Sequence, residues 1–445
     1  MRISLIYLSL QDITFVKRLY SKLMNNLKRN KKWEWAYLLM YMPFIVTILS
    51  HIFVSGTRLK AETWQITELL INYQGGFIRR GLIGEIMYFL KSTLGIDVII
   101  QAYIFSIASF ILFSYLIIKD TIKRGYSILM LPTAMLLSSL FVSEHWVRKD
   151  VFIMLLFYAV VRLLRNRKFF NYLLANILLI IGTLSHEIIL FIAAPTILIS
   201  QLTYDDKRVG IKKLLRGVAT SVLYFSPVLA TGVLVAINKG DITTAQAIWD
   251  SWVQQGVLNT EMKGAIAGVG WTSKYAIEYG TEVWTTVRCG VYYPIMWTLL
   301  SLCAFVIFVW MYKPKPQLFG YKPTNDFNTQ ESAYIIIAQF LAVVPLLLVF
   351  ADTSRLFFYV VMSAYIIRLY DNKNCYTTLL GNLPKTIAKK MNAVENYIAG
   401  HTKSFIAFAF IIGLPSISVS ALEHIVLHGQ VGFFFKSIID LIKAL

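Results

Sequence analysis

The stretch that decides the fold lies near the middle of the chain, where residues 171–203 read NYLLANILLIIGTLSHEIILFIAAPTILISQLT. One helix needs about 20 apolar residues to cross a bilayer, so this stretch is too long for a single crossing. His186 and Glu187 interrupt it near its centre. The pattern therefore predicts two helices, over 169–185 and 188–203, that meet at a polar His-Glu pair.

The composition of the whole chain agrees with a membrane environment. The 445 residues are 57% hydrophobic and only 15% charged, whereas soluble domains carry about 25% charged residues. The formal net charge is +19, but a nucleic-acid surface needs a solvated basic face, and few residues here can be solvated. We therefore expect a membrane lipid surface and no nucleic acid as a partner.

Apolar runs recur along most of the chain. They predict an all-α, polytopic integral membrane protein with about 11 transmembrane helices, with 10 and 12 as the bounds, and with interfacial helices in its outer loops. The expected spans are 36–56, 98–118, 127–143, 151–166, 169–185, 188–203, 217–238, 291–312, 333–351, 356–370 and 404–422.

Basic residues give the expected orientation, because Lys and Arg are retained on the cytoplasmic side. With the N-terminus inside, 29 of the 43 basic residues flank the spans on the cytoplasmic side. Residues 1–35 form a basic cytoplasmic segment and not a cleavable signal peptide. A single membrane domain then covers 36–429, and the amphipathic segment 430–445 is either an interfacial helix or a twelfth crossing.

Two expected outer loops are long, 57–97 and 239–290. The first predicts two interfacial helices around the Gly75-Gly76 break. The second carries four tryptophans, which either lie at the membrane surface or stack against sugar rings. They are Trp249, Trp252, Trp271 and Trp284.

Ionisable residues gather in four short segments that this topology places on the outer side. Arg79 and Arg80 follow the two glycines, and paired arginines suit the oxygens of a phosphate or carboxylate. His186 and Glu187 are candidates for a general base. The other two segments are 144–150, with Arg148, Lys149 and Asp150, and 352–355, with Asp352 and Arg355.

Simpler readings exist for each segment. The arginines can contact lipid headgroups, Glu144 can pair with Arg148, and Asp352 can pair with Arg355 at helical spacing. The His-Glu pair can be a polar kink. Four such segments on one side nevertheless indicate that something polar and anionic is handled there.

Motifs of soluble enzymes are absent, including the P-loop, the dinucleotide fingerprint and zinc-ligand spacing. The three cysteines, Cys289, Cys303 and Cys375, are too scattered for a disulfide framework or a thiolate metal site. We expect no metal and no cofactor.

This arrangement of many spans, a long late outer loop, and outer arginines near carboxylates and a histidine resembles the Wzy-type O-antigen and capsular polysaccharide polymerases. It is also similar to the wider GT-C group of lipid-linked glycosyltransferases, whose first outer loop carries functional acids, here Glu62, Glu68 or Glu85. The resemblance rests on arrangement across the whole chain and not on a diagnostic motif.

The resemblance implies a polymerase that joins undecaprenyl-diphosphate-linked oligosaccharide repeat units on the outer side of the bacterial inner membrane. A chain-length regulator protein is a further partner that such polymerases use. Arg79, Arg80, Arg148, Lys149 and Arg355 would hold the diphosphate. Glu187 or His186 would deprotonate the acceptor, with Asp150 and Asp352 as orienting partners or the alternative base.

Two other classes stay open from the sequence. One is a flippase or exporter of lipid-linked glycans, although neither internal repeats nor midplane ionisable residues are visible. The other is a membrane acyltransferase that modifies glycans, with His186 as base.

Overall fold

The computed structural model describes residues 59–123, 146–166, 168–202, 210–272, 329–347, 353–370 and 375–382, together with short pieces and single residues elsewhere. Everything below concerns this part of the chain. The expected spans 36–56, 127–143, 291–312 and 404–422 fall almost entirely outside it, as do segments 1–35 and 430–445.

The described chain is all-α, as the sequence predicts. Its only strands are the two-residue β1, Val287–Arg288, and β2, Val291–Tyr292, which pair antiparallel. In chain order the helices are α4 Trp64–Leu69, α5 Leu82–Leu94, α6 Val98–Lys123, α8 Asp150–Leu164, α9 Phe169–Ser185, α10 Ile188–Leu202, α11 Ile211–Tyr224, α12 Ser226–Ile237, α13 Ile242–Gln254, α14 Gly264–Val269, α18 Thr329–Leu347, α19 Thr353–Tyr370 and α20 Cys375–Leu380.

The apolar runs correspond closely to helices. Six expected spans coincide with α6, α8, α9, α10, α18 and α19, and the break at His186-Glu187 lies where predicted. The two helices expected around Gly75-Gly76 are α4 and α5. These predictions of helix position are confirmed.

The expected span 217–238 is not one straight helix. Two helices, α11 and α12, occupy this region and are bent by 73° at their junction. Phe225 leaves helical geometry at φ −109° and ψ 19°, and Pro227 stands in the first turn of α12. Proline is tolerated in a first turn but not inside a continuous helix.

By length and composition, only the segment Val98–Thr121 among the described helices meets the criterion for crossing a membrane alone. The bent pair α11 and α12 would add a second. The helices α9, α10, α18 and α19 contain shorter apolar segments.

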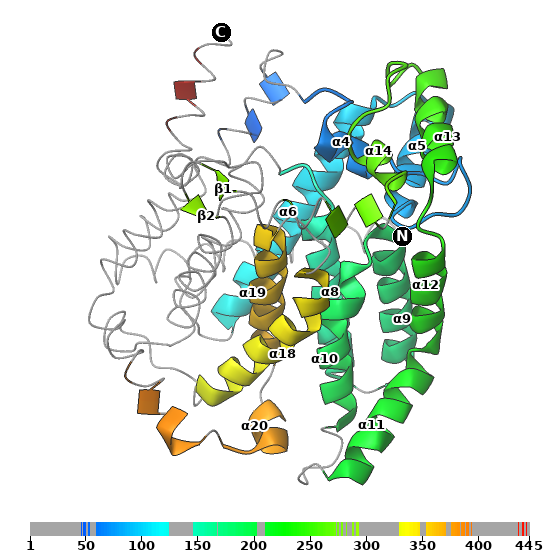
Figure 1. The fold of residues 1–445 in the computed structure, drawn as a ribbon. Coiled ribbons are helices and arrows are strands. Elements are labelled where there is room, and N and C mark those ends of the chain that lie inside the picture. The colour runs from blue at the N-terminus through cyan, green and yellow to red at the C-terminus, as the bar shows by residue number, and fades with distance from the viewer. Residues whose placement is uncertain are drawn as a thin grey trace, which may run out of the picture.

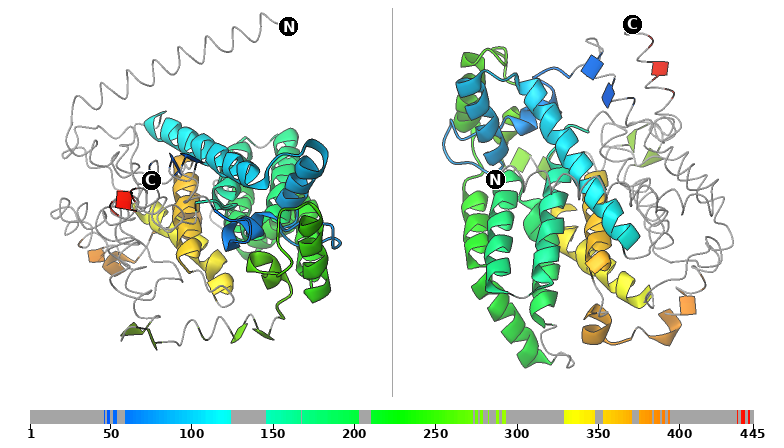
Figure 2. Two further views of the ribbon diagram at one scale, coloured as in Figure 1. Left: turned by 90° about the horizontal axis from the view of Figure 1, so that it is seen from above. Right: turned by 180° about the vertical axis from the view of Figure 1, so that it is seen from behind.

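The helices form two layers, which Figure 1 shows one above the other. The bundle consists of α6, α8, α9, α10, α12, α18 and α19, in which α8 packs against α6, α9, α10 and α19. The cap consists of α4, α5, α13 and α14, in which α14 packs against both α4 and α13. Figure 2 shows α6 running obliquely across the bundle from the cap.

Two tryptophans form the interior of the cap. Trp249 and Trp252 on α13 are completely buried. The indole N–H of Trp249 donates to the carbonyl of Asn259 at 2.8 Å, and that of Trp252 to the carbonyl of Leu70 at 2.7 Å. The prediction that these two rings stack against sugars is therefore wrong, because no face of either ring is accessible.

The chain direction brings four helix ends to the cap. The helices α8, α10 and α19 begin next to it, and α9 ends there (Figure 1). Three of the four polar segments predicted from the sequence are attached to these ends, and the fourth, with Arg79 and Arg80, lies in the cap between α4 and α5. We call this end of the bundle the cap end.

Candidate functional site

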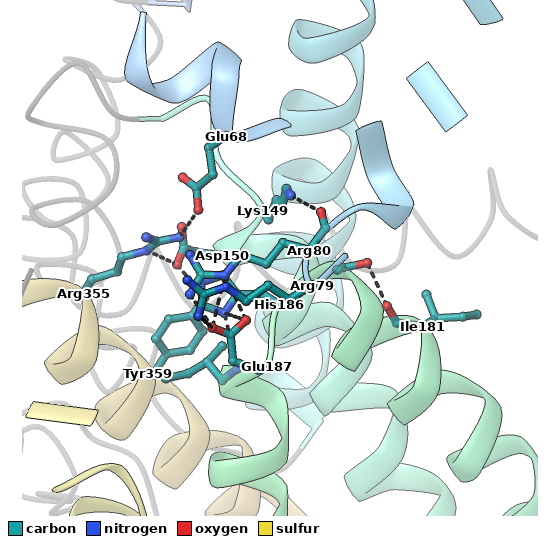
Figure 3. Close-up of polar contacts among 12 residues, drawn as sticks. Glu68, Arg79, Arg80, Lys149, Asp150, Ile181, His186, Glu187, Arg355 and Tyr359 are labelled. Carbon is teal, nitrogen blue, oxygen red and sulfur yellow. Dashed lines mark hydrogen bonds and ion pairs between the residues drawn. The ribbon is translucent and has the colours of Figure 1, made fainter. Parts of the chain in front are cut away.

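The predicted polar segments converge at the interface of cap and bundle. Arg79 and Arg80 come from the loop between α4 and α5, His186 and Glu187 from the α9–α10 junction, and Arg355 from α19. Lys149 and Asp150 come from the start of α8. Figure 3 shows these side chains directed toward one another, with Glu68 above them on α4. We call this group, with Arg148 and Tyr359, the cap-end cluster.

Arg80 occupies a strained backbone position at the centre of the cap-end cluster. Its φ of 65° is the only positive φ of a non-glycine residue in the described chain, and a conformation of this kind costs about 1–3 kcal/mol. The guanidinium holds Glu187 with two nitrogens, Nε lying 2.8 Å from Oε2 and Nη2 contacting Oε1. A bidentate pair of this type fixes orientation as well as charge.

Lys149 holds the same turn from the other side. Its Nζ donates to the carbonyl oxygen of Arg80 at 2.8 Å, and the side chain is fully buried. Burial lowers the pKa of Lys149 from 10.5 to about 7, helped by the charge of Arg80 and opposed by that of Glu68. Near neutral pH this ammonium is therefore only partly protonated.

Arg355 joins three elements in the interior of the cluster. Its Nε donates to Oδ1 of Asp150 at 2.5 Å, and its Nη2 donates to Oε1 of Glu68 at 2.9 Å. The hydroxyl of Tyr359 also donates to Oδ1 of Asp150. A cap helix, α8 and α19 are thus connected through one buried guanidinium.

The exposure of the side chains gives the cluster an outer and an inner part. Arg79 is the most open member, with 40% of its side chain exposed, and its Nη1 lies 3.9 Å from Oε1 of Glu187. Arg80 and Glu187 are each 18% exposed. Arg148, Lys149, Asp150, His186, Glu68 and Arg355 are all buried. An incoming ligand would therefore reach Arg79 first.

The cluster contains more cationic than anionic groups. Arg79, Arg80, Arg148 and Arg355, together with Lys149, accompany three carboxylates, those of Glu68, Asp150 and Glu187. Lys149 is only partly protonated and Arg79 is 40% exposed, so the positive charge in excess lies at the open edge of the cluster. The arrangement therefore favours binding of an anion.

The local pKa values fix the charge states. Burial alone would raise the pKa of Glu187, but the charge and hydrogen bonds of Arg80, with the charge of Arg79, hold it well below its usual range. The charges of Arg355 and Arg148 likewise overcome burial and lower the pKa of Glu68. Burial, with the charge of Arg80, lowers the pKa of His186 well below its usual value. At neutral pH Glu187 and Glu68 are ionised and His186 is neutral.

The loop that carries the two arginines is built on glycines and a carboxylate. Glu85 accepts hydrogen bonds from the backbone N–H of Tyr73 at 2.8 Å and from the side-chain amide of Gln74 at 2.9 Å. Gly76 has φ +105°, and a Cβ on Gly75 would lie 2.7 Å from the carbonyl oxygen of Thr244 on α13. The loop can approach α13 this closely only because Gly75 has no side chain.

Some predicted residues lie outside the described chain, namely Glu144, Asp352 and Trp284. The expected pair of Asp352 with Arg355 therefore stays a prediction, and within the described chain Arg355 pairs with Asp150 and Glu68. Trp271 is partly exposed, and its ring lies 6.0 Å from that of Trp64 and 5.1 Å from that of Tyr275. Sugar stacking stays a prediction for Trp271.

Two members of the cluster were not in the predicted set. Glu68 appeared only as one of three acids in the first outer loop, and nothing in its sequence neighbourhood distinguishes it from Glu62. Tyr359 had a weak signal, because it follows Arg355 at helical i,i+4 spacing. Its aromatic ring otherwise fits the apolar pattern of α19.

Among the residues that the structure describes, no group of three or more His, Cys, Asp and Glu side chains could hold a metal ion. Comparisons with family models, with curated proteins and with solved structures find no match to this chain.

Proposed function

We propose that this protein is a polytopic membrane enzyme of about 11 spans, the polymerase of polyprenyl-diphosphate-linked oligosaccharide units expected above. One observation carries the proposal. The basic side chains of the cap-end cluster come from several separate segments and outnumber its carboxylates. At the edge of the cluster, the side chain of Arg79 is 40% exposed. A diphosphate is an anion that such a set of donors suits.

The outer surface of the bundle supports placement in a bilayer. Large apolar side chains stand exposed on α9, α11 and α12, which water would not favour over so large an area. Examples are Phe169 at 80%, Leu215 at 64% and Val233 at 58% exposed. With the N-terminus inside, the cap would face the periplasm of a bacterial inner membrane.

The proposed reaction is glycosyl transfer. The oxygen of an acceptor hydroxyl attacks the anomeric carbon of the donor glycan, and the bond from that carbon to the diphosphate oxygen breaks. The electron pair of the broken bond leaves with the diphosphate, where guanidinium groups stabilise the added charge. The hydroxyl proton passes to His186 or Glu187. Both have lowered pKa values, so proton transfer would accompany C–O bond formation rather than precede it.

The geometry suggests different roles for the neighbouring arginines. Arg79 is free to turn from Glu187 to a phosphate, because its only ion pair within the described chain is the long one of 3.9 Å. Arg80 is locked against Glu187 and positions that carboxylate. Arg355 lies deeper and keeps Asp150 and Glu68 in place.

The proposal is tested by reconstituting the purified protein in liposomes with undecaprenyl-diphosphate-linked repeat units. The wild type should produce a ladder of longer glycans on a size-resolving gel. Arg79→Gln should reduce product formation at least tenfold, because removal of a charged hydrogen bond to a transition-state oxyanion costs about 1.5–3 kcal/mol. The partly exposed Arg79 can be replaced with little risk to folding.

Arg165→Gln is the matched control. Arg165 caps the far end of α8 and is exposed, so its loss should leave the ladder unchanged. Lipid-linked units that cross the bilayer without forming new bonds would indicate a flippase. A ladder of normal yield from Arg79→Gln would overturn the assignment of diphosphate binding to this residue.

A further inference from the structure

The proposed chemistry does not involve the helix α11. It lies at the end of the bundle opposite the cap (Figure 1), follows α10 in the chain and packs against it. Its sequence, IKKLLRGVATSVLY, contains three basic residues and no acid. Most of its side chains are exposed.

The side chains of α11 divide into three stripes at 100° per residue. One stripe is exposed and apolar and consists of Ile211, Leu215, Val218 and Val222. Lys212, Arg216 and the half-buried Lys213 form a basic stripe on roughly the opposite side over the first half of the helix, and the exposed Leu223 lies on that side near its end. Gly217 belongs to the third stripe, which packs on the bundle, and a Cβ there would lie 2.5 Å from a methyl carbon of Leu202.

The bend that separates α11 from α12 is held by specific contacts. The side-chain amide of Asn176 on α9 donates to the carbonyl of Tyr224 at 3.0 Å, a carbonyl in the last turn of α11. The ring of Tyr172 stacks on that of Tyr224 with centroids 5.0 Å apart. The carbonyl of Tyr224, which lacks a helical partner at the bend, is thus hydrogen-bonded. The 73° bend is therefore stabilised by side chains of α9.

We infer that α11 is an in-plane anchor that lies on the cytoplasmic leaflet and binds anionic phospholipid, and that the chain turns into the membrane at the 12-residue α12. The apolar stripe would enter the acyl region while the basic stripe contacts headgroup phosphates, the arrangement typical of interfacial helices. Each Lys or Arg near an anionic surface contributes about 1 kcal/mol of attraction. The helix α11 itself contains no acid that would repel an anionic surface.

This inference rests on the membrane placement in the proposed function but not on its chemistry. It also accounts for the bend inside the expected span 217–238, since a helix that lies in the membrane plane cannot form half of a straight crossing. The basic stripe agrees with the cytoplasmic side expected for this end of the bundle.

The orientation is tested with nitroxide labels in the full-length protein reconstituted in nanodiscs, after replacement of its three cysteines by serine. Labels at Ile211, Leu215, Val218 and Val222 report depth through their relative accessibility to oxygen and to a nickel chelate. An in-plane helix should give equal depths at all four positions. A helix that spans would give a steady change over about 16 Å, which would overturn the inference.

A label at Ile177, which is exposed on α9, tests the membrane placement separately from the role of α11 as an anchor. High oxygen accessibility there supports membrane placement, whereas access of the nickel chelate would contradict it. Failure at α11 with success at Ile177 would overturn only the anchor.

Lipid preference is tested by comparing nanodiscs of phosphatidylglycerol with nanodiscs of phosphatidylcholine. The wild type should unfold at a higher midpoint temperature in phosphatidylglycerol. The triple variant Lys212→Gln, Lys213→Gln, Arg216→Gln should lose most of that difference. The matched control Lys385→Gln, Lys389→Gln, Lys390→Gln removes the same charge from other exposed positions and should keep it. An equal loss in both variants would indicate net charge instead of a site on α11.

Discussion

At the scale of single residues, the cap-end cluster depends on a turn that its own side chains hold in place. The left-handed conformation of Arg80 is unfavourable by itself. Lys149 binds the carbonyl of this residue and Glu187 binds its guanidinium. These two contacts keep Arg80 in its strained conformation, so its guanidinium is in position before a ligand binds. Arg80 is therefore a positioning residue as much as a binding residue.

Lys149 should make stability depend on pH. Its pKa is about 7 in the folded protein, against 10.5 for an unperturbed lysine. Between these values the unfolded chain binds a proton that the folded chain lacks, so the free energy of unfolding should rise with pH by up to about 1.4 kcal/mol per unit. Thermal unfolding of the protein in nanodiscs at pH 7 and pH 9 measures this change.

Lys149→Met is the comparison for this dependence. It keeps the length of the side chain and removes the titrating group, so the rise in stability from pH 7 to pH 9 should be smaller than in the wild type. His186 titrates well below this range in both proteins. Equal slopes for wild type and variant would show that Lys149 does not have a lowered pKa.

At the scale of elements, the apolar periodicity was sufficient to locate the bundle helices. The limits of α9 coincide with the expected segment 169–185, because a long apolar run ends at an ionisable pair. The bend before α12 was not predicted, since Pro227 follows an apolar run that looks continuous. Nor could the sequence show that Trp249 and Trp252 are buried, because burial there depends on tertiary contacts, of α13 with α14 and of Trp252 with Leu70 and Tyr88.

The close approach of α5 to the preceding loop gives a prediction at this scale. A Cβ on Gly84 would lie 2.0 Å from the carbonyl oxygen of Ile71, a backbone atom that cannot rotate away. Gly84→Ala should therefore lower the free energy of unfolding by about 1–3 kcal/mol or more and displace the loop of Arg79 and Arg80. Thermal unfolding measures the first effect and product formation the second.

Gly210→Ala is the control for this change. Nothing lies within 4 Å of a Cβ at Gly210, so the same substitution there should leave product formation unchanged and cost less than about 1 kcal/mol, the effect of replacing an N-cap glycine. Unaltered stability in Gly84→Ala would mean that α5 can move away from the loop without cost.

At the scale of the whole molecule, the ion pairs of Arg355 connect the two layers. The sequence predicted that the polar segments share one side, because the order of the spans fixes their direction. It could not predict that Arg355 reaches Asp150 and Glu68, which are 205 and 287 residues distant in the chain. Such partners are set by how the helices pack and are not visible in local spacing.

Breaking this connection should loosen the cap from the bundle. Arg355→Leu leaves the buried carboxylates of Asp150 and Glu68 without their main counter-charge, and loss of one partner from a buried pair costs about 3–5 kcal/mol. We expect a lower unfolding midpoint and faster hydrogen exchange in α4 and α14. Lys263→Gln is the control, because Lys263 forms an exposed pair with Glu261 in the same layer, and loss of such a pair costs less than about 1 kcal/mol. If Arg355→Leu were no more destabilising than Lys263→Gln, the cap would be held by apolar packing alone, and the buried guanidinium would be available for the substrate instead.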